Sequence, residues 1–311
     1  MSSLRPSYAV IGDPVEHSLS PRIFAHFFDE LGIDAHYTAL RVRREELPSL
    51  LQTLRSGVLA GVSVTLPHKE FIVDLLDDLH PTARRIGAVN CVARLGGRLV
   101  GHNTDARGFR LALERAGLPL AGTRLVLIGA GGAARAAAFA AALAGAKSVA
   151  IANRDPKRGL RLVRDLCQTG WAWPEGEAQR ELEAEGWRPS AAGPSGRSFV
   201  SFHPLETRAL QQAVTHAQVL VNATSVGLET EESPLPPGIA LPPGLCALDM
   251  VYRPLATAFL RQVEAEGGRT VDGLWMLLFQ AAEQLRIWTG RTVPAATVER
   301  LHRELEREIR A

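Results

Sequence analysis

A cluster of glycines near the middle of the chain follows an apolar run and precedes an alanine-rich run, in the sequence RLVLIGAGGAARAAAFAAALAG. Gly129, Gly131 and Ala134 match the pattern G-x-G-x-x-A, in which the first glycine permits a tight turn and the second lets the backbone approach a pyrophosphate. The start of the helix that follows favours negative charge. We expect a strand over residues 124–128, a helix over 133–144 and a strand over 148–153. This order predicts a dinucleotide-binding site on the glycine loop.

Strand-like and helix-like runs alternate from one end of the chain to the other, which is typical of an α/β protein with mainly parallel sheets. Gly96 and Gly97 lie between two of these runs and predict a hairpin turn. Outside the glycine-loop unit, the predicted strands cover residues 8–12, 35–40, 61–65, 88–95, 98–102, 199–202, 219–222 and 246–249, and the predicted helices cover 21–31, 45–56, 273–288 and 295–309.

The order of the runs predicts two domains. Residues 1–105, completed by helices at 274–311, form an α/β substrate domain, and residues 106–273 form a doubly wound Rossmann domain for the cofactor. Residues 168–197 interrupt the second domain as an insertion rich in Gly, Pro, Glu and Arg. We expect a surface excursion there. The alternative is a lid or a partner contact, because exposed tryptophans favour interfaces and the insertion contains Trp171, Trp173 and Trp187.

The composition indicates a soluble globular protein. Of the 311 residues, 46% are hydrophobic and 22% charged, and the net charge of +2 gives no reason to expect nucleic acid or a membrane surface as a partner. Cys91, Cys167 and Cys246 lie far apart in the sequence, so we expect neither disulfides nor a metal site. The first residues are too polar for a secretory signal. These observations predict a cytoplasmic protein, and they leave a monomer and a homodimer both open.

The end of the strand at 148–153 bears on the choice of dinucleotide. Enzymes that use NAD usually place Asp or Glu there to accept hydrogen bonds from the ribose hydroxyls. This chain has Asn153, Arg154 and Asp155, with Arg158 one helical turn further on. The two arginines could clamp a 2′-phosphate, because arginine offers a planar fork of donors. We therefore predict NADP, and the Asp155 carboxylate, which would repel a phosphate, leaves NAD as the alternative.

Two segments before the glycine loop hold candidate catalytic groups. One ends in Lys69 and the other in Asp105, and each follows a predicted strand, where α/β sheets place their ligands. Lys69 could donate a hydrogen bond to a substrate oxygen while charged, and Asp105 could orient it. From spacing alone, two surface charges in loops are the better explanation.

Eight short motifs, in order, resemble those of shikimate dehydrogenases over nearly the whole chain. They are His17-Ser-Leu-Ser-Pro21, Val64-Thr-Leu-Pro-His-Lys69, Gly87-Ala-Val-Asn90, Asn103-Thr-Asp105, Gly129-Ala-Gly-Gly-Ala133, Asn222-Ala-Thr-Ser225, Asp249-Met-Val-Tyr252 and Asp272-Gly-Leu, the last followed by Gln280-Ala-Ala. The resemblance implies an oxidoreductase that reduces 3-dehydroshikimate to shikimate with NADPH, reversibly, in the biosynthesis of aromatic amino acids.

The resemblance also implies a role for each matched residue. Lys69 and Asp105 would be the catalytic pair, and Ser18 and Ser20 would hold the substrate carboxylate; Ser20 could also cap the helix that begins at Pro21. The groups expected to bind or approach the substrate ring are Thr65, Asn90, Asp105, Gln280 and Tyr252. The residues expected to bind the cofactor are Gly129, Ala130, Gly131, Gly132, Ala133, Asn153, Arg154, Arg158, Thr224, Met250 and Gly273.

The chain departs from the family pattern at several positions. Ser63 replaces an Asn, Phe24 a His, Trp275 a Gly and Asp155 a Thr. These departures leave open an NAD-dependent quinate/shikimate dehydrogenase, with the same chemistry. A catalytically silent regulator on the same fold and a methylene-tetrahydrofolate dehydrogenase are further alternatives. The presence of both Lys69 and Asp105 argues against the silent regulator.

Overall fold

The computed structural model describes residues 5–170, 177–184 and 199–310. The chain forms two compact units, the first made of Met1–Arg107 and Leu278–Glu304 and the second of Gly108–Leu277 and Leu305–Ala311. The predicted substrate domain comprises residues 1–105 and 274–311, whereas the first unit of the structure extends to Arg107 and takes only Leu278–Glu304 from the tail. Trp171, Trp173 and Trp187 of the predicted insertion lie outside the described residues.

The first unit contains a mixed sheet with the strand order β2-β1-β3-β5-β6-β4. Its strands are β1 (Ser7–Gly12), β2 (His36–Arg41), β3 (Gly61–Val64), β4 (Asp78–Leu79), β5 (Cys91–Leu95) and β6 (Arg98–His102). Its helical segments are α1 (Ser20–Leu31), η1 (Arg44–Glu46), α2 (Leu47–Arg55), η2 (Phe71–Leu75) and α3 (Pro81–Ile86), with most of α10 (Gly273–Thr289) and α11 (Ala295–Arg310) from the tail.

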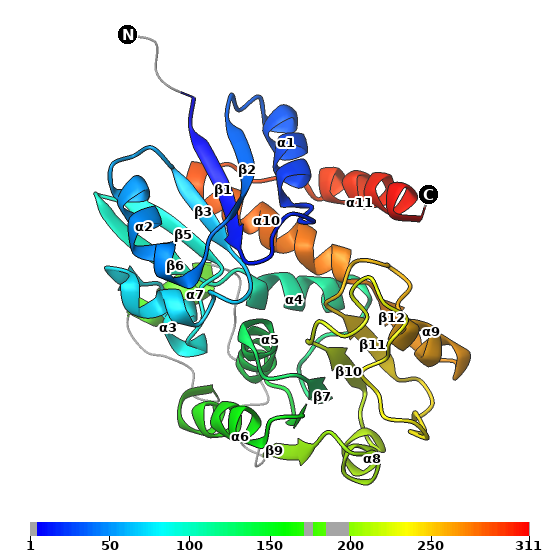
Figure 1. Cartoon of the computed structure of the whole chain (residues 1–311). Helices are drawn as coiled ribbons and strands as arrows, with labels where there is room; N and C mark the ends of the chain where they lie inside the picture. Colours follow the sequence, from blue (N-terminus) through cyan, green and yellow to red (C-terminus); the bar gives the residue numbers. More distant parts are fainter. Residues whose placement is uncertain (1–4, 171–176, 185–198, 311) are drawn as a thin grey trace. The chain divides into compact units, whose positions relative to one another are not determined.

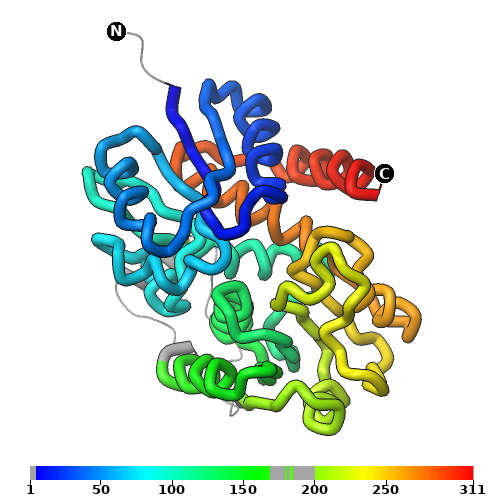
Figure 2. Tube along the Cα trace, in the orientation of Figure 1, coloured from blue at the N-terminus to red at the C-terminus, as the bar shows by residue number. Residues whose placement is uncertain are grey.

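Alternation of side chains along β1 explains how the first sheet is covered on both faces. Ala9 and Ile11 point to the face packed under α2 and η2, in a core cluster with Leu47 and Leu51. Tyr8 points to the other face, where it stacks on Trp288 of α10 with ring centroids 4.9 Å apart. Figure 2 traces the tail, in orange, past β1, in blue. The tail therefore completes the core of the first unit.

The predicted strand over residues 88–95 is shorter than expected, because it begins only at Cys91. Helix α3 ends at Ile86, and its C-cap residue Gly87 has a φ of 68°, in the left-handed region that favours glycine. The Val89 N–H then bonds to the carbonyl of Lys69 at 2.7 Å instead of joining the sheet ladder. This detour places Asn90 next to the segment that carries Lys69. β5 and β6 pair antiparallel through Leu95 and Arg98, which confirms the predicted hairpin.

The second unit contains a parallel sheet with the strand order β12-β11-β10-β7-β8-β9 (Figure 1). Its strands are β7 (Arg124–Ile128), β8 (Ser148–Asn153), β9 (Phe199–Pro204), β10 (Val219–Asn222), β11 (Cys246–Asp249) and β12 (Arg269–Val271). Its helices are most of α4 (Asp105–Arg115), α5 (Gly132–Leu143), α6 (Pro156–Asp165), α7 (Glu177–Ala184), α8 (Thr207–Val214) and α9 (Ala258–Ala265), with a π-type turn, η3, over Leu166–Gly170.

The core of the second unit confirms the expected Rossmann-type α/β architecture. Val126 and Ile128 of β7 pack with Leu210 of α8 and Phe259 of α9 on one face of the sheet. Helix α5 is buried along almost its whole length, and its alanines permit close contact of helix and sheet. Among the described residues, no helix is long and apolar enough to cross a membrane.

Candidate active site

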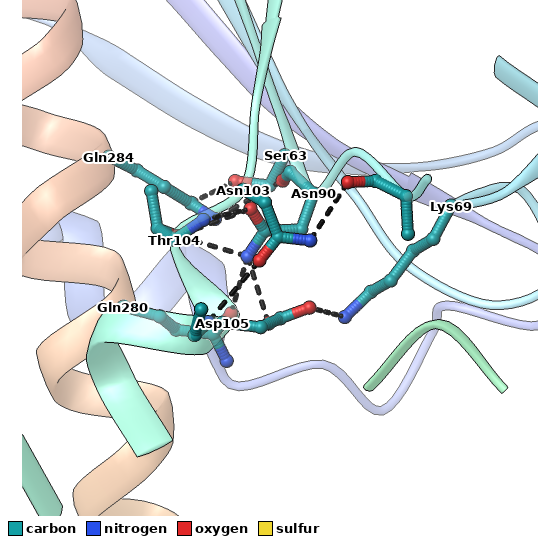
Figure 3. A network of polar contacts seen from close by, with 10 residues as sticks. Ser63, Lys69, Asn90, Asn103, Thr104, Asp105, Gln280 and Gln284 are labelled. Atoms are coloured by element: carbon teal, nitrogen blue, oxygen red, sulfur yellow. Dashed lines mark hydrogen bonds and ion pairs between the residues drawn. The ribbon is translucent and has the colours of Figure 1, made fainter. Parts of the chain in front are cut away.

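Lys69 and Asp105 form a close ion pair in the first unit (Figure 3). Lys69 Nζ donates to Asp105 Oδ2 at 2.6 Å, and the Lys69 side chain is 12% exposed whereas that of Asp105 is fully buried. Asp105 is the first residue of α4, where a helix start favours negative charge. Asn103 stabilises this start, because its Oδ1 accepts the N–H of Ala106 at 3.2 Å. The two residues predicted as the catalytic pair are therefore in direct contact, with the ammonium on the accessible side.

Asn90 lies at the centre of the polar network around this pair (Figure 3). Its Nδ2 is within 2.9 Å of Thr104 Oγ1 and Asp105 Oδ1 and 2.8 Å from Gln280 Oε1. Its Oδ1 accepts the N–H of Thr104 at 2.7 Å. An amide nitrogen carries only two hydrogens, so the three acceptors cannot all be satisfied at once. The Gln280 side chain is half-buried and can therefore turn to a ligand while Asn90 keeps Asp105 in place.

A second chain of hydrogen bonds joins the sheet of this unit to α10. Tyr37 Oη donates to Ser63 Oγ at 2.6 Å, and Ser63 Oγ donates to Gln284 Oε1 at 2.5 Å. Gln284 Nε2 then donates to the carbonyl of Asn90 at 3.2 Å. Burial raises the pKa of Tyr37, so its hydroxyl stays protonated and donates. Sequence reasoning did not identify Gln284; its position one helical turn after Gln280 is the signal that could have found it.

The serines and threonine predicted to bind substrate lie on two neighbouring segments of the same unit. The Ser20 N–H donates to Ser18 Oγ at 3.2 Å, and Tyr37 is hydrogen-bonded to Ser20 as well as to Ser63. The suggestion that Ser20 caps α1 is wrong, because the helix begins at Ser20 itself and its N-cap residue is Leu19, whose apolar side chain accepts no hydrogen bond. Thr65 packs on Gly12, where an added Cβ would lie only 2.5 Å from Thr65 Cγ2.

The glycine loop of the second unit has the geometry that a pyrophosphate site needs. Gly129 has φ of 122°, in the region that favours glycine, and an added Cβ would lie 2.9 Å from the carbonyl oxygen of Ala223. Gly131 is the N-cap residue of α5, and no side chain among the described residues caps that helix. The first amides of a helix have no intrahelical partner, so Gly132 and Ala133 present N–H groups to an anion here. These residues fit a dinucleotide.

The segment after β8 places two arginines and one carboxylate beside that loop. Arg158 Nη2 would lie 3.8 Å from a Cβ added to Gly131, so its guanidinium reaches the glycine loop. Arg154 and Asp155 are exposed. Asp155 is the N-cap residue of α6: its Oδ1 accepts the N–H of Lys157 at 2.9 Å and that of Arg158 at 3.4 Å. The amides at the helix start thus offset part of the charge that we expected to oppose a phosphate.

The remaining predicted site residues follow other strands of the second sheet. Thr224 comes after β10 and Met250 after β11, while Gly273 is the first residue of α10, after β12. Tyr252, half-buried in the segment after β11, also belongs to the second unit, and its place beside the substrate stays a prediction. Trp275, which departs from the family pattern, is buried, and the guanidinium carbon of Arg115 lies 3.4 Å from its ring centroid.

Comparison with known protein families matches two parts of the chain. Residues 10–92 match the shikimate dehydrogenase substrate binding domain, and residues 273–301 match the shikimate 5′-dehydrogenase C-terminal domain. A curated relative from Moorella thermoacetica, a shikimate dehydrogenase (NADP(+)), is 39% identical over 298 residues, which cover 95% of this chain and 92% of the relative.

Solved structures give the same result. The shikimate 5-dehydrogenase of Thermus thermophilus, in complex with NADP(H) and shikimate, has a TM-score of 0.76 and 39% identity, over 96% of this chain and 99% of that one. The shikimate 5-dehydrogenase of Listeria monocytogenes, in complex with shikimate and NAD, has a TM-score of 0.81 and 30% identity, over 97% of both chains. The resemblance found in the motifs is thereby confirmed over nearly the whole chain.

Proposed function

This chain belongs to the shikimate dehydrogenase family, and we propose that it catalyses the reversible reduction of 3-dehydroshikimate to shikimate by NADPH. In this reaction the ketone carbon receives a hydride and the ketone oxygen a proton, while NADPH becomes NADP⁺. The observation that carries the proposal is the Lys69–Asp105 pair, with Nζ and Oδ2 2.6 Å apart inside a polar network. We place the reaction in the biosynthesis of aromatic amino acids.

Lys69 and Asp105 have different roles at the substrate oxygen: Lys69 contacts it, and Asp105 orients Lys69. A lysine ammonium has three donors, so the bond to Asp105 leaves donors for the ketone oxygen of a bound substrate. There Lys69 stabilises the negative charge that develops on the oxygen and passes it a proton. Asp105, held by Asn90 and fully buried, fixes the direction of the ammonium. The order of groups is substrate oxygen, Lys69, Asp105 and Asn90.

The substrate is a small acid with several hydroxyl groups, and its recognition requires convergent polar groups. We assign the carboxylate to Ser18 and Ser20, whose hydroxyls give directional hydrogen bonds without a salt bridge. We assign the ring hydroxyls to Thr65, Asn90 and Gln280, with Asp105 shared between ring and Lys69. Asn90 and Gln280 already contact each other at 2.8 Å, which supports a shared ligand.

NADP supplies the hydride chemistry when it is bound, and the second unit has the residues that fit it. We assign the pyrophosphate to the loop at Gly129–Ala133 and the start of α5. We assign the 2′-phosphate to Arg154 and Arg158, with Asn153 beside them, because arginine pairs with phosphate through parallel hydrogen bonds. Thr224, Met250 and Gly273 complete the cofactor side in this proposal.

We further propose that the first unit binds substrate and the second binds cofactor. The protein then acts in the cytoplasm on small molecules, as a monomer or a homodimer, without nucleic acid or membrane as a partner. The net charge of +2 supports the part of this proposal that concerns nucleic acid and membrane.

Replacement of Lys69 tests the proposed function. We expect Lys69→Ala to lower turnover by about 10²- to 10⁴-fold, the usual range for loss of an acid–base group. Its affinity for NADPH, measured by calorimetry, should stay close to that of the wild type. Lys147→Ala, at an exposed lysine of the second unit, is the matched control and should retain full activity. Turnover of the Lys69 variant within a few-fold of wild type would remove Lys69 from the mechanism.

A second candidate function is an NAD-dependent quinate/shikimate dehydrogenase. Asp155 favours it, because an exposed carboxylate after β8 is in the region where NAD enzymes bind the ribose hydroxyls. The Lys69–Asp105 chemistry would be unchanged. Rates with each acid and each cofactor separate the two functions.

A further inference from the structure

Two fully buried polar side chains lie at the carboxyl edge of the second sheet, and the proposed mechanism uses neither. Asn222 ends β10, Asp249 ends β11, and the two residues are partners in the parallel register. Both residues have no exposed surface. A side chain without exposed surface cannot contact a ligand, so any effect on a ligand must pass through the residues it holds.

The amide of Asn222 holds the segment that follows β10. Its Oδ1 accepts the N–H of Thr224 at 3.1 Å and the Thr224 hydroxyl at 2.7 Å, and its Nδ2 donates to the carbonyl of Val226 at 3.0 Å. Thr224 Oγ1 in turn accepts the N–H of Val226 at 3.1 Å. The backbone of this turn is therefore fixed at each end by one side chain.

The carboxylate of Asp249 joins that turn to the segment after β11 and to α9. Its Oδ1 accepts from Asn222 Nδ2 and from the N–H of Val251, both at 2.9 Å. Its Oδ2 accepts the hydroxyl of Thr257 at 2.7 Å, and Thr257 Oγ1 caps α9 by accepting the N–H of Leu260. Burial raises the pKa of Asp249 to about 6, because removal from water disfavours the charged form of this carboxyl group.

Each of the two segments packs directly on a glycine of the proposed cofactor site. A Cβ added to Gly129 would lie 2.9 Å from the carbonyl oxygen of Ala223, and one added to Gly273 would lie 2.6 Å from that of Val251. β7, β10, β11 and β12 are neighbours in the sheet, as Figure 1 shows, so these contacts lie along one edge. A displacement of either segment would therefore move a glycine that the cofactor needs.

We propose that Asn222 and Asp249 are positioning residues that set the affinity for NADP by holding the segments after β10 and β11 against Gly129 and Gly273. The inference rests on the proposed function, since it takes NADP as the ligand of this edge. Neither residue contributes a group to the cofactor. Their effect appears mainly in cofactor affinity, because the other proposed substrate groups belong to the first unit and only Tyr252 lies in a segment that they hold.

The test compares four variants of the full chain. Asp249→Ala removes the shared acceptor, and Thr257→Val removes one donor to it, together with the side-chain cap on α9, at nearly constant volume. Asp249→Asn keeps an acceptor for Val251 and Asn222 and offers Thr257 a donor instead. Thr123→Val is the matched control, because Thr123 is buried and donates to the carbonyl of Leu120 at 2.7 Å before β7, away from this edge. For each variant we would measure Tm, the Kd for NADPH by calorimetry and the KM for shikimate.

We expect Asp249→Ala to raise the Kd for NADPH by about tenfold or more, and Thr257→Val by about threefold, with a smaller change in the KM for shikimate. Asp249→Asn should restore most of the affinity, and Thr123→Val should lower only Tm. If Asp249→Ala does not fold, Thr257→Val decides. Variants that lose Tm but bind NADPH like wild type would overturn the inference, as would an Asp249→Asn variant as weak as Asp249→Ala. Wild-type protein that failed to bind NADPH would instead overturn the proposed function.

Discussion

Separate removal of the two charges of the Lys69–Asp105 pair should have unequal effects on stability. Lys69→Met leaves the fully buried Asp105 carboxylate without its cation, whereas Asp105→Asn leaves an ammonium on a side chain that is 12% exposed and can reach water. Two unit charges 2.6 Å apart attract by about 6 kcal/mol at an effective dielectric constant of about 20, and desolvation offsets much of this. We expect Lys69→Met to lower the free energy of unfolding by about 3 kcal/mol and Asp105→Asn by about 1–2 kcal/mol.

The double variant separates an interacting pair from two independent groups. Because it has neither charge, it should be more stable than Lys69→Met alone. For turnover, each single variant should lose about 10³-fold, and the double variant should be no slower than the slower single one, because residues that act as a unit are not additive.

Denaturant titration and initial rates are measured on the wild type, the two single variants and the double variant. Together they give one double-mutant cycle for stability and one for turnover. Arg55→Gln is the control, because Arg55 forms an ion pair with Asp77 in the same unit and has no place in the proposed mechanism. It should leave turnover unchanged. Losses in stability that are equal for the two single variants, or losses in turnover that multiply in the double variant, would refute the reasoning.

Three further predictions concern other parts of the chain. Asp155→Asn keeps the cap on α6 and removes a negative charge, so it should lower the Kd for NADP⁺ by about threefold and leave NAD⁺ unchanged in calorimetry; equal shifts for both would contradict this. Burial lowers the pKa of His102 to about 3, so the folded protein keeps this imidazole neutral while the unfolded chain protonates it below about pH 6.5. The stability of the fold is therefore greatest above that pH and decreases as the pH falls. The unfolding free energy should drop by about 2 kcal/mol between about pH 6.5 and pH 5, and His102→Phe should remove this drop. Gly61→Ala should lower Tm, because its Cβ would come within van der Waals overlap of Trp288; an unchanged Tm would argue that the ring moves freely.

Much of the second unit could be predicted from residues alone. Parallel strands buried on both faces are short, nearly continuous apolar runs, and the runs at 124–128, 148–153, 219–222 and 246–249 match β7, β8, β10 and β11 in full. The strands missed were β4 and β12, which contain two and three residues. A strand of two or three residues is too short to show an alternating pattern in the sequence. Such a strand forms because a neighbouring strand pairs with it.

The candidate site was predictable one residue at a time and not as a network. The sequence motifs predicted four site residues, and the structure joins them by hydrogen bonds: Lys69, Asn90, Asp105 and Gln280. The bond from Ser63 to Gln284 spans 221 positions in the sequence, so no local pattern signals it. The roles of Asn222 and Asp249 were also hidden, since a motif does not reveal which members are buried.

We propose that this chain oxidises shikimate with NADP⁺ through the Lys69–Asp105 pair. The most direct test is a set of initial rates of reduced cofactor formation, with shikimate or quinate as substrate and NADP⁺ or NAD⁺ as cofactor. We predict the highest kcat/KM for shikimate with NADP⁺, and almost no turnover for Lys69→Ala with that pair. A large preference for quinate with NAD⁺, or NADPH binding without turnover of either acid, would contradict the account.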